Sequence, residues 1–116
     1  MQKDRLAFRF LTIGLVLVFG WFGIDKFLHP LTWIGWMPTW MDGLMGMPKD
    51  TWLQVTGAIE IVLAAALLFP IRIIRRIASI GIILHLIAVI TQIGINDIFV
   101  RDVGLLCAAV ALALLL

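Results

Sequence analysis

Residues 77–95 read IASIGIILHLIAVITQIGI and contain no Asp, Glu, Lys or Arg. A helix needs about 20 mostly apolar residues to cross roughly 30 Å of hydrocarbon, so this stretch is long enough to span a bilayer. A buried strand would be only about 4–8 residues long. The alternation of apolar and polar residues that marks a membrane-barrel strand is also absent. The stretch therefore predicts a transmembrane helix.

Three further stretches of similar length are also mostly apolar, at residues 8–28, 52–69 and 98–116. The chain is 63% hydrophobic and 14% charged, whereas soluble domains are roughly half apolar and a quarter charged. A soluble fold of this size could not hide so much apolar surface. We expect a single all-α transmembrane domain over residues 1–116, a four-helix bundle surrounded by the lipid bilayer. The first stretch ends without a small-residue cleavage site, so we expect a retained span.

Composition also excludes several classes of protein. The formal net charge is only +2 and no long Lys/Arg block is present, which argues against nucleic-acid binding. The single cysteine, Cys107, lies in a Leu/Ala run and predicts a packing residue rather than a disulfide. The sequence has no pair of metal-binding residues at the spacing typical of a metal site. It also has no recognisable haem, flavin or iron–sulfur motif.

Lysine and arginine are unevenly distributed between the two ends of the predicted bundle. Six of them lie before or at the start of the first span or in the link between the second and third spans. Cytoplasmic segments carry an excess of these residues, so we expect both termini in the cytoplasm and the chain in the cell (plasma) membrane. The six are Lys3, Arg5, Arg9, Arg72, Arg75 and Arg76.

Residues 29–50, HPLTWIGWMPTWMDGLMGMPKD, form a Trp-rich segment between the first two spans. Trp33, Trp36 and Trp40 suit the headgroup level, where an indole is half buried and its N–H finds a polar partner. One interpretation is an interfacial cap on the outer side of the bundle. The other is a lid over a ligand cavity lined by adaptable methionines. These would be Met37, Met41, Met45 and Met47.

Ionisable side chains inside a bilayer cost roughly 2.5–3.5 kcal/mol each, so their positions are informative. Glu60 and His85 fall near the middle of the second and third spans, and Gln92 follows His85 on the same helix face. The small and polar residues of the third span predict a seam that faces the bundle. They are Ala78, Gly81, His85, Ala88 and Gln92. Lipid would then contact Ile82, Ile83, Leu86, Ile87 and Ile90.

The other charges within the spans gather toward the predicted outer half. Asp25 and Lys26 end the first span, and Arg101 and Asp102 begin the fourth. We expect Lys26 to lie within reach of Glu60, because neither charge is tolerated alone in a bilayer. Each residue also has a purely structural interpretation. Lys26 and Arg101 could extend to headgroups, Asp102 could cap its helix, and His85 and Glu60 could only join helices.

The first span ends in Trp21-Phe22-Gly23-Ile24-Asp25-Lys26-Phe27, which resembles the Gly-x-x-Lys signature of the DoxX family of small four-span membrane proteins. Gly57-Ala58-Ile59-Glu60 is similar to its Gly-x-x-Glu, and Arg101-Asp102 to its basic-Asp pair. The resemblance extends over most of the chain. It implies a shared polar site formed by Lys26, Glu60, Arg101 and Asp102. The DoxX family includes a membrane subunit of thiosulfate:quinone oxidoreductase.

Three functions follow as hypotheses. The first is the membrane subunit of a quinone-linked redox system, where the chain binds a quinone without being the catalytic subunit. The second is binding or transport of a small lipophilic or weakly acidic molecule, with Glu60 or His85 carrying protons. The third is a structural partner protein without its own chemistry. A redox partner subunit and self-association into a homo-oligomer both stay open.

Overall fold

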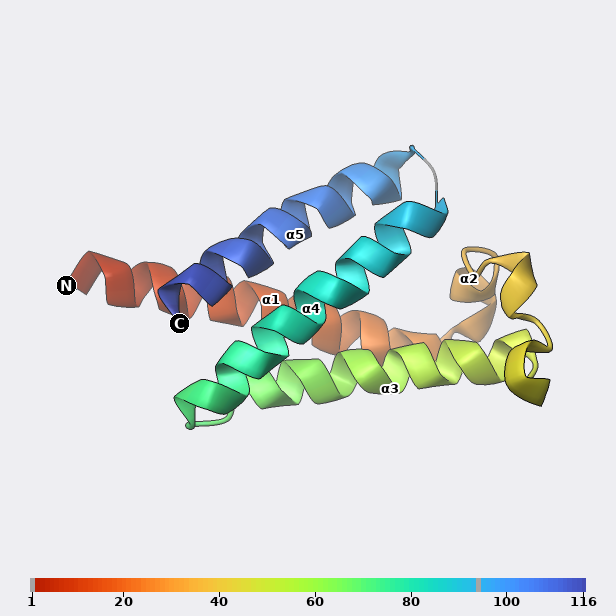
Figure 1. Ribbon diagram of the computed structural model, residues 1–116, viewed down its shortest axis with the longest axis horizontal. Coiled ribbons are helices and arrows are strands. Elements are labelled where there is room, and N and C mark those ends of the chain that lie inside the picture. Colours follow the sequence, from red (N-terminus) through yellow and green to blue (C-terminus); the bar gives the residue numbers. More distant parts are fainter. Residues whose placement is uncertain (1, 94) are drawn as a thin grey trace.

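The computed structural model describes residues 2–93 and 95–116 (Figure 1). Within these residues the protein is all-helical, and four of its helices are long and apolar enough to cross a membrane. These are α1 (Gln2–Leu28), α3 (Lys49–Leu67), α4 (Arg72–Ile93) and α5 (Asp97–Leu115). The Trp-rich segment contains the short helix α2 (Pro30–Ile34) and the 3₁₀ turns η1 (Thr39–Met41) and η2 (Leu44–Gly46).

Local sequence signals set the helix ends. His29 precedes a proline and leaves the helical region, with φ −131° and ψ 62°, which ends α1. Asn96 caps α5, where its side chain accepts a hydrogen bond from the Phe99 N–H at 3.0 Å. Pro70 follows the end of α3 and prevents that helix from continuing.

Three helices begin three or more residues earlier than the apolar stretches predicted. α1 begins at residue 2 rather than 8, α3 at 49 rather than 52 and α4 at 72 rather than 77. The added turns are polar or basic, and helical hydrogen bonding continues through them although they are not part of the apolar span. Residues 1 and 94, which fall in the expected domain and in the expected third span, lie outside the described residues.

The long helices form two hairpin-like pairs. α1 packs along α3 and α4 packs along α5, and further contacts join α3 to α4 and α1 to α5. The α4–α5 pair is inclined to the α1–α3 pair in Figure 1. The core lies where the two pairs cross. It contains Leu15, Phe19, Ala64, Leu67, Ala78, Ile82, Leu86, Ala109 and Leu112.

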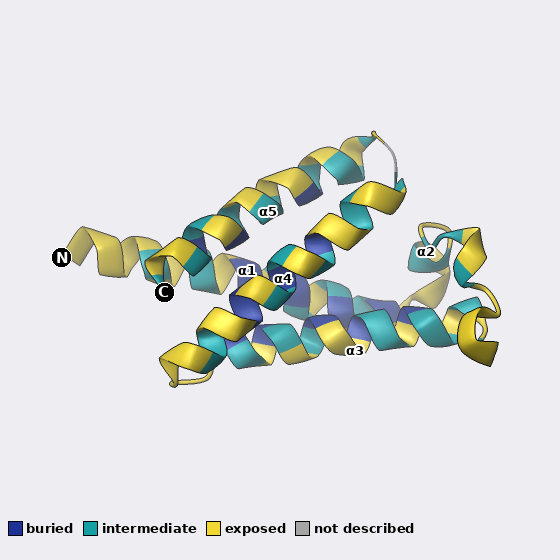
Figure 2. Cartoon of the chain, in the orientation of Figure 1, coloured by how far each residue is buried: buried dark blue, intermediate teal, exposed yellow. Residues whose placement is uncertain are grey.

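Exposed apolar side chains cover the outside of all four long helices. Figure 2 shows the buried residues on the inward sides of the ribbons and exposed residues over the outer surface. Leu17, Val62 and Leu84 are 66%, 65% and 63% exposed. Large apolar surfaces of this kind are rare on soluble monomers, and they suit contact with lipid tails.

The predicted lipid-facing side of the third span is partly wrong. Ile82 and Leu86 are buried, whereas Ala88 and Gln92 are exposed. The reason is that α4 packs against α3 on one side and α5 on the other, so its buried arc is wider than a single seam and is displaced from the predicted one. Gly81 still allows a close approach, since a Cβ there would lie 2.8 Å from the Leu63 side chain.

Candidate functional site

Two glycines bring α1 and α3 together beside the candidate site. A Cβ on Gly23 would lie 2.7 Å from the carbonyl oxygen of Gly57, and a Cβ on Gly57 would lie 2.9 Å from that of Gly23. Only glycine permits this separation of the two backbones. Lys26 and Glu60 each lie three residues further along, on the same helix face as the adjacent glycine. The close approach therefore sets the two charged side chains opposite each other.

Lys26 and Glu60 form a buried ion pair, as the cost of isolated charges predicted. Lys26 Nζ contacts Glu60 Oε1, and both side chains are almost entirely buried. On the other side of the carboxylate, His85 Nε2 lies 3.7 Å from Glu60 Oε2. The imidazole in turn packs edge-on against Phe19, with ring centroids 5.9 Å apart. A carboxylate is thus held between an ammonium group and an imidazole inside the bundle.

Trp33 covers this ion pair from the Trp-rich segment. Its ring centroid lies 4.3 Å from Lys26 Nζ, a cation–π contact, and its ring packs 5.2 Å from that of Phe22. Asp25 holds the indole in place, because its Oδ2 accepts a hydrogen bond from Trp33 Nε1 at 2.8 Å. Its Oδ1 accepts from His29 Nδ1 at 2.6 Å. Asp25 is therefore an anchor for the Trp-rich segment.

Arg101 and Asp102 lie near the start of α5. Asp102 is only 3% exposed, and its Oδ1 accepts hydrogen bonds from Arg101 Nε and Nη2 at 3.0 and 2.9 Å. The guanidinium group also lies 4.6 Å from the centroid of the Phe22 ring. Asn96, and not Asp102, caps the helix. The Arg101–Asp102 pair thus connects α5 to α1 through an aromatic ring.

A cavity of about 330 Å³, which we call the Trp-covered cavity, lies beside the Lys26–Glu60 pair. Six of the seven polar site residues predicted from the sequence line it, and Asp25 does not. The six are Lys26, Glu60, His85, Gln92, Arg101 and Asp102. Trp33, Trp36 and Trp40 line it from the Trp-rich segment, together with Met37 and Met41. Met45 and Met47 are not among its lining residues, and Met45 is 83% exposed.

Residues 15–93, about two thirds of the chain, match a protein family described as a domain of unknown function (DUF8561). The chain belongs to the DUF8561 family. None of the curated proteins and none of the solved structures matches it. The matched part of this DUF8561 chain contains Lys26, Glu60, His85 and the whole Trp-rich segment, whereas Arg101 and Asp102 follow it.

Hydrogen bonds hold the Trp-rich segment of the DUF8561 protein unevenly. Toward α3, Trp52 Nε1 donates to the Leu44 carbonyl at 3.0 Å, and the Lys49 N–H donates to Asp42 Oδ1 at 3.0 Å. Across the cavity, Trp40 Nε1 donates to Gln92 Oε1 of α4 at 3.1 Å, and both residues are exposed. The segment is thus well attached to the α1–α3 pair and loosely attached to α4.

Aromatic residues of the spans were missed as site residues. Phe19 and Phe22 line the Trp-covered cavity, and Phe22 contacts both Trp33 and Arg101. The helical period contained the signal, since residues 19, 22 and 26 share one face of α1. In a span so rich in apolar residues, however, two phenylalanines do not stand out. No group of three or more His, Cys, Asp or Glu side chains in the described part of the DUF8561 chain could hold a metal ion.

Proposed function

We propose that the protein spans the cell membrane four times, with both termini in the cytoplasm, and binds the head group of a quinone-like lipophile in the Trp-covered cavity. The observation that carries the proposal is the buried Lys26–Glu60–His85 cluster, which borders a cavity covered by aromatic side chains. Ligand pockets typically combine apolar and aromatic walls with a few convergent polar groups.

The chemistry of the walls suits a flat ring that carries carbonyl groups. Lys26 and His85 offer N–H donors to carbonyl oxygens, and Trp33 and Phe22 offer aromatic faces to the ring. A volume of about 330 Å³ is near the lower end of the range for ligand pockets. It suits a head group whose apolar tail extends between helices into lipid.

The resemblance to the DoxX family supports a place in a quinone-linked redox system. In that role this chain binds and orients the quinone, and a partner subunit supplies or receives the electrons. Glu60 and His85, 3.7 Å apart, are placed to exchange protons with a bound ring, since a quinone takes up protons when it is reduced.

A second function, binding or transport of a small weakly acidic lipophile, is favoured by the same pair of titratable groups. Such a ligand would bring a proton with it and could deliver it to Glu60 or His85. Proton-coupled flux of a weak acid through liposomes that contain the protein would favour this function. A quinone that binds without flux would favour the first.

The test is binding of a short-chain benzoquinone to the protein in lipid nanodiscs, followed by quenching of tryptophan fluorescence. Val89 is half-buried and lines the Trp-covered cavity, whereas Val62 is exposed on α3 and does not. We expect Val89→Phe to fill the cavity and weaken binding at least about tenfold. Val62→Phe adds the same volume on the lipid-facing side and leaves binding unchanged. Equal quenching of both variants and the parent would mean partition into lipid and would contradict the proposal.

A further inference from the structure

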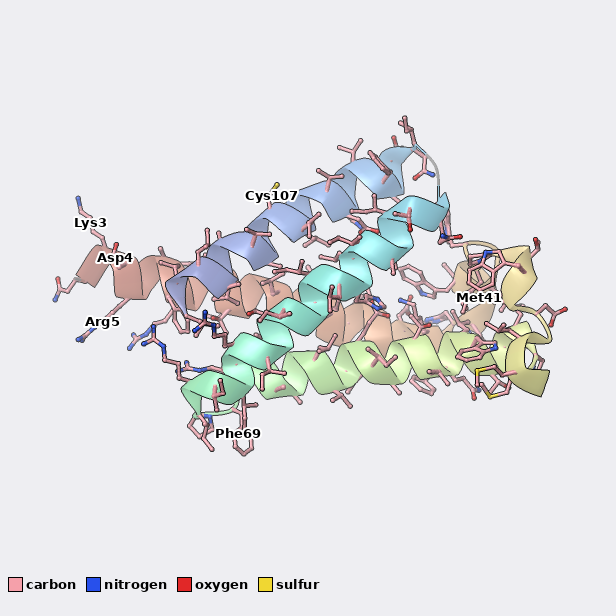
Figure 3. All side chains as sticks on the ribbon, in the orientation of Figure 1. Lys3, Asp4, Arg5, Met41, Phe69 and Cys107 are labelled. Atoms are coloured by element: carbon pink, nitrogen blue, oxygen red, sulfur yellow. The ribbon has the colours of Figure 1, made fainter. Side chains whose placement is uncertain are left out.

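A second cavity, of about 570 Å³, lies at the end of the bundle remote from the Trp-rich segment. We call it the arginine cavity. It is bordered by the N-terminal part of α1, the end of α5 and the beginning of α4. Nitrogen atoms of several long side chains gather between these elements in Figure 3, near the labelled Arg5. Four arginines line the cavity, and one acidic residue, Asp4, lies with them. The arginines are Arg5, Arg9, Arg72 and Arg75.

Arg72 already has structural partners. Its Nε donates to the carbonyl oxygen of Leu116 at 2.7 Å and its Nη2 to that of Leu115 at 3.2 Å. These bonds satisfy carbonyl groups at the end of α5, where the helix dipole also favours a cation. Arg72 therefore serves the fold, and the oxyanion-binding capacity of the cavity depends on the other three arginines.

Arg75 is the half-buried member of the set. Its guanidinium carbon lies 5.1 Å from the centroid of the Phe8 ring. Its Nε atom is buried and has no hydrogen-bond partner among residues 2–93 and 95–116. An arginine fork presents several donors in one plane and matches a phosphate or carboxylate. No carboxylate among residues 2–93 and 95–116 forms an ion pair with Arg75, which lines the arginine cavity, so its guanidinium group is available to an anion there.

Apart from Thr12, the other side chains that line the arginine cavity are apolar. Phe8 and Leu67 form part of its lining, and Ile13 and Leu68 extend it to the exposed side of α1 and α3, where they are 53% and 65% exposed. A small inorganic anion would use the arginines and leave this surface in contact with water. An amphiphile would use both parts, with its charged group among the arginines and its chains along Ile13 and Leu68.

We propose that the arginine cavity binds the phosphodiester headgroup of an anionic membrane lipid. Arg75 donates to the phosphate, Arg5 and Arg9 add positive charge around it, and the acyl chains lie against Ile13 and Leu68. The inference rests on the four-span placement proposed above, which puts this end at the cytoplasmic leaflet, where anionic headgroups attract basic pockets between helices. Inorganic phosphate shares the oxyanion chemistry but has no acyl chains.

Native mass spectrometry of the purified protein tests the inference. The protein is incubated with phosphatidylglycerol, with phosphatidylcholine of the same acyl chains, or with inorganic phosphate. Arg75→Gln and Arg76→Gln are the matched variants, because the two arginines are neighbours and Arg76 does not line the arginine cavity. We expect the parent to retain phosphatidylglycerol over phosphatidylcholine. We expect Arg75→Gln to lower that retention about fivefold and Arg76→Gln to leave it within about twofold.

Three outcomes would overturn the assignment. Equal losses in Arg75→Gln and Arg76→Gln would mean general charge attraction to the membrane surface. Equal retention of both lipids would mean that the headgroup charge is not recognised. Displacement of the lipid by millimolar inorganic phosphate would assign the cavity to the free anion. Benzoquinone binding to the same samples separates this inference from the proposed function, because Arg75 is remote from the Trp-covered cavity.

Discussion

The Lys26–Glu60 pair connects α1 and α3 through two charges that lipid would not accept singly. Burying each ion costs several kcal/mol, and the mutual attraction offsets this cost only when the geometry is good. The pair therefore aligns α1 with α3 more than it contributes to net stability. It fixes which turn of α1 faces which turn of α3, and it sets the donors that border the Trp-covered cavity.

Glu60→Gln should destabilise the protein. Gln keeps the shape of the side chain but leaves the Lys26 ammonium group buried without a counter-charge. Removing one partner of a buried pair costs roughly 3 kcal/mol or more in soluble proteins, so we expect a clear fall in Tm of the purified protein. Asp50→Asn, at an exposed position in the first turn of the same helix, is the control and should lower Tm much less, because it loses only a helix-dipole contribution of about 0.3–1 kcal/mol. Adding Lys26→Met to Glu60→Gln should recover much of the loss.

Charged residues within the spans could be selected as candidates from the sequence, because every one of them has a cost in lipid. Their individual directions could not all be predicted. Asp25 and Lys26 are neighbours, so their side chains point roughly 100° apart on the helix. Lys26 points toward Glu60 and Asp25 toward the Trp-rich segment. Met45 and Met47 lie outside the Trp-covered cavity. The sequence could not predict this, because an irregular segment has no period that predicts which side chains share a face.

At the scale of the helices, the Gly23–Gly57 contact should be the most sensitive point. An added methyl group at Gly23 would lie 2.7 Å from both the Gly57 carbonyl oxygen and Ile61 Cγ1, so the α1 and α3 backbones must separate. Overpacking of this kind typically costs about 1–3 kcal/mol. We expect Gly23→Ala to lower Tm and weaken benzoquinone binding. Gly14→Ala, on the same helix, meets no atom within 4 Å and should do neither. Equal effects of the two substitutions would contradict this account.

The existence and approximate limits of the four long helices could be predicted from apolar length alone. The buried side of α4 could not, because that side depends on two neighbours rather than one. Ser79, Ile82 and Leu86 are buried between α3 and α5, although a seam of small and polar residues predicted a different side. In an apolar span, isoleucine suits the core as well as lipid, so hydrophobicity alone does not distinguish the two.

At the scale of the whole molecule, α1 is longer than the hydrocarbon it would cross. Its 27 residues extend about 40 Å, against roughly 30 Å of hydrocarbon. In the proposed placement, the basic first turns of α1 project from the apolar layer on the same side as the arginine cavity. The Trp-rich segment lies at the other end of the long helices (Figure 1). These two ends give the molecule a basic side and an aromatic side.

This polarity predicts the orientation in the membrane. In a variant with Cys107→Ala, a single cysteine is introduced as Thr39→Cys in η1 or as Gln2→Cys at the start of α1. We expect a membrane-impermeant maleimide to label Thr39→Cys on intact cells. Gln2→Cys should be labelled only after permeabilisation, because the proposed orientation puts the basic end in the cytoplasm. The reverse pattern of labelling would show that the proposed orientation is inverted.

Trp33 links the position of the Trp-rich segment to the stability of the Lys26–Glu60 ion pair. Its indole donates to Asp25 and covers the ammonium group of Lys26, so one side chain belongs both to the Trp-rich segment and to the surroundings of the ion pair. Moving the segment outward would separate ring from cation and bring water toward the charge. The coupling between two binding equilibria is reciprocal. A ligand that holds the segment over the Trp-covered cavity would therefore stabilise the ion pair by the same free energy with which the ion pair stabilises the bound ligand. Ligand binding in the Trp-covered cavity would in this way stabilise the buried Lys26–Glu60 pair.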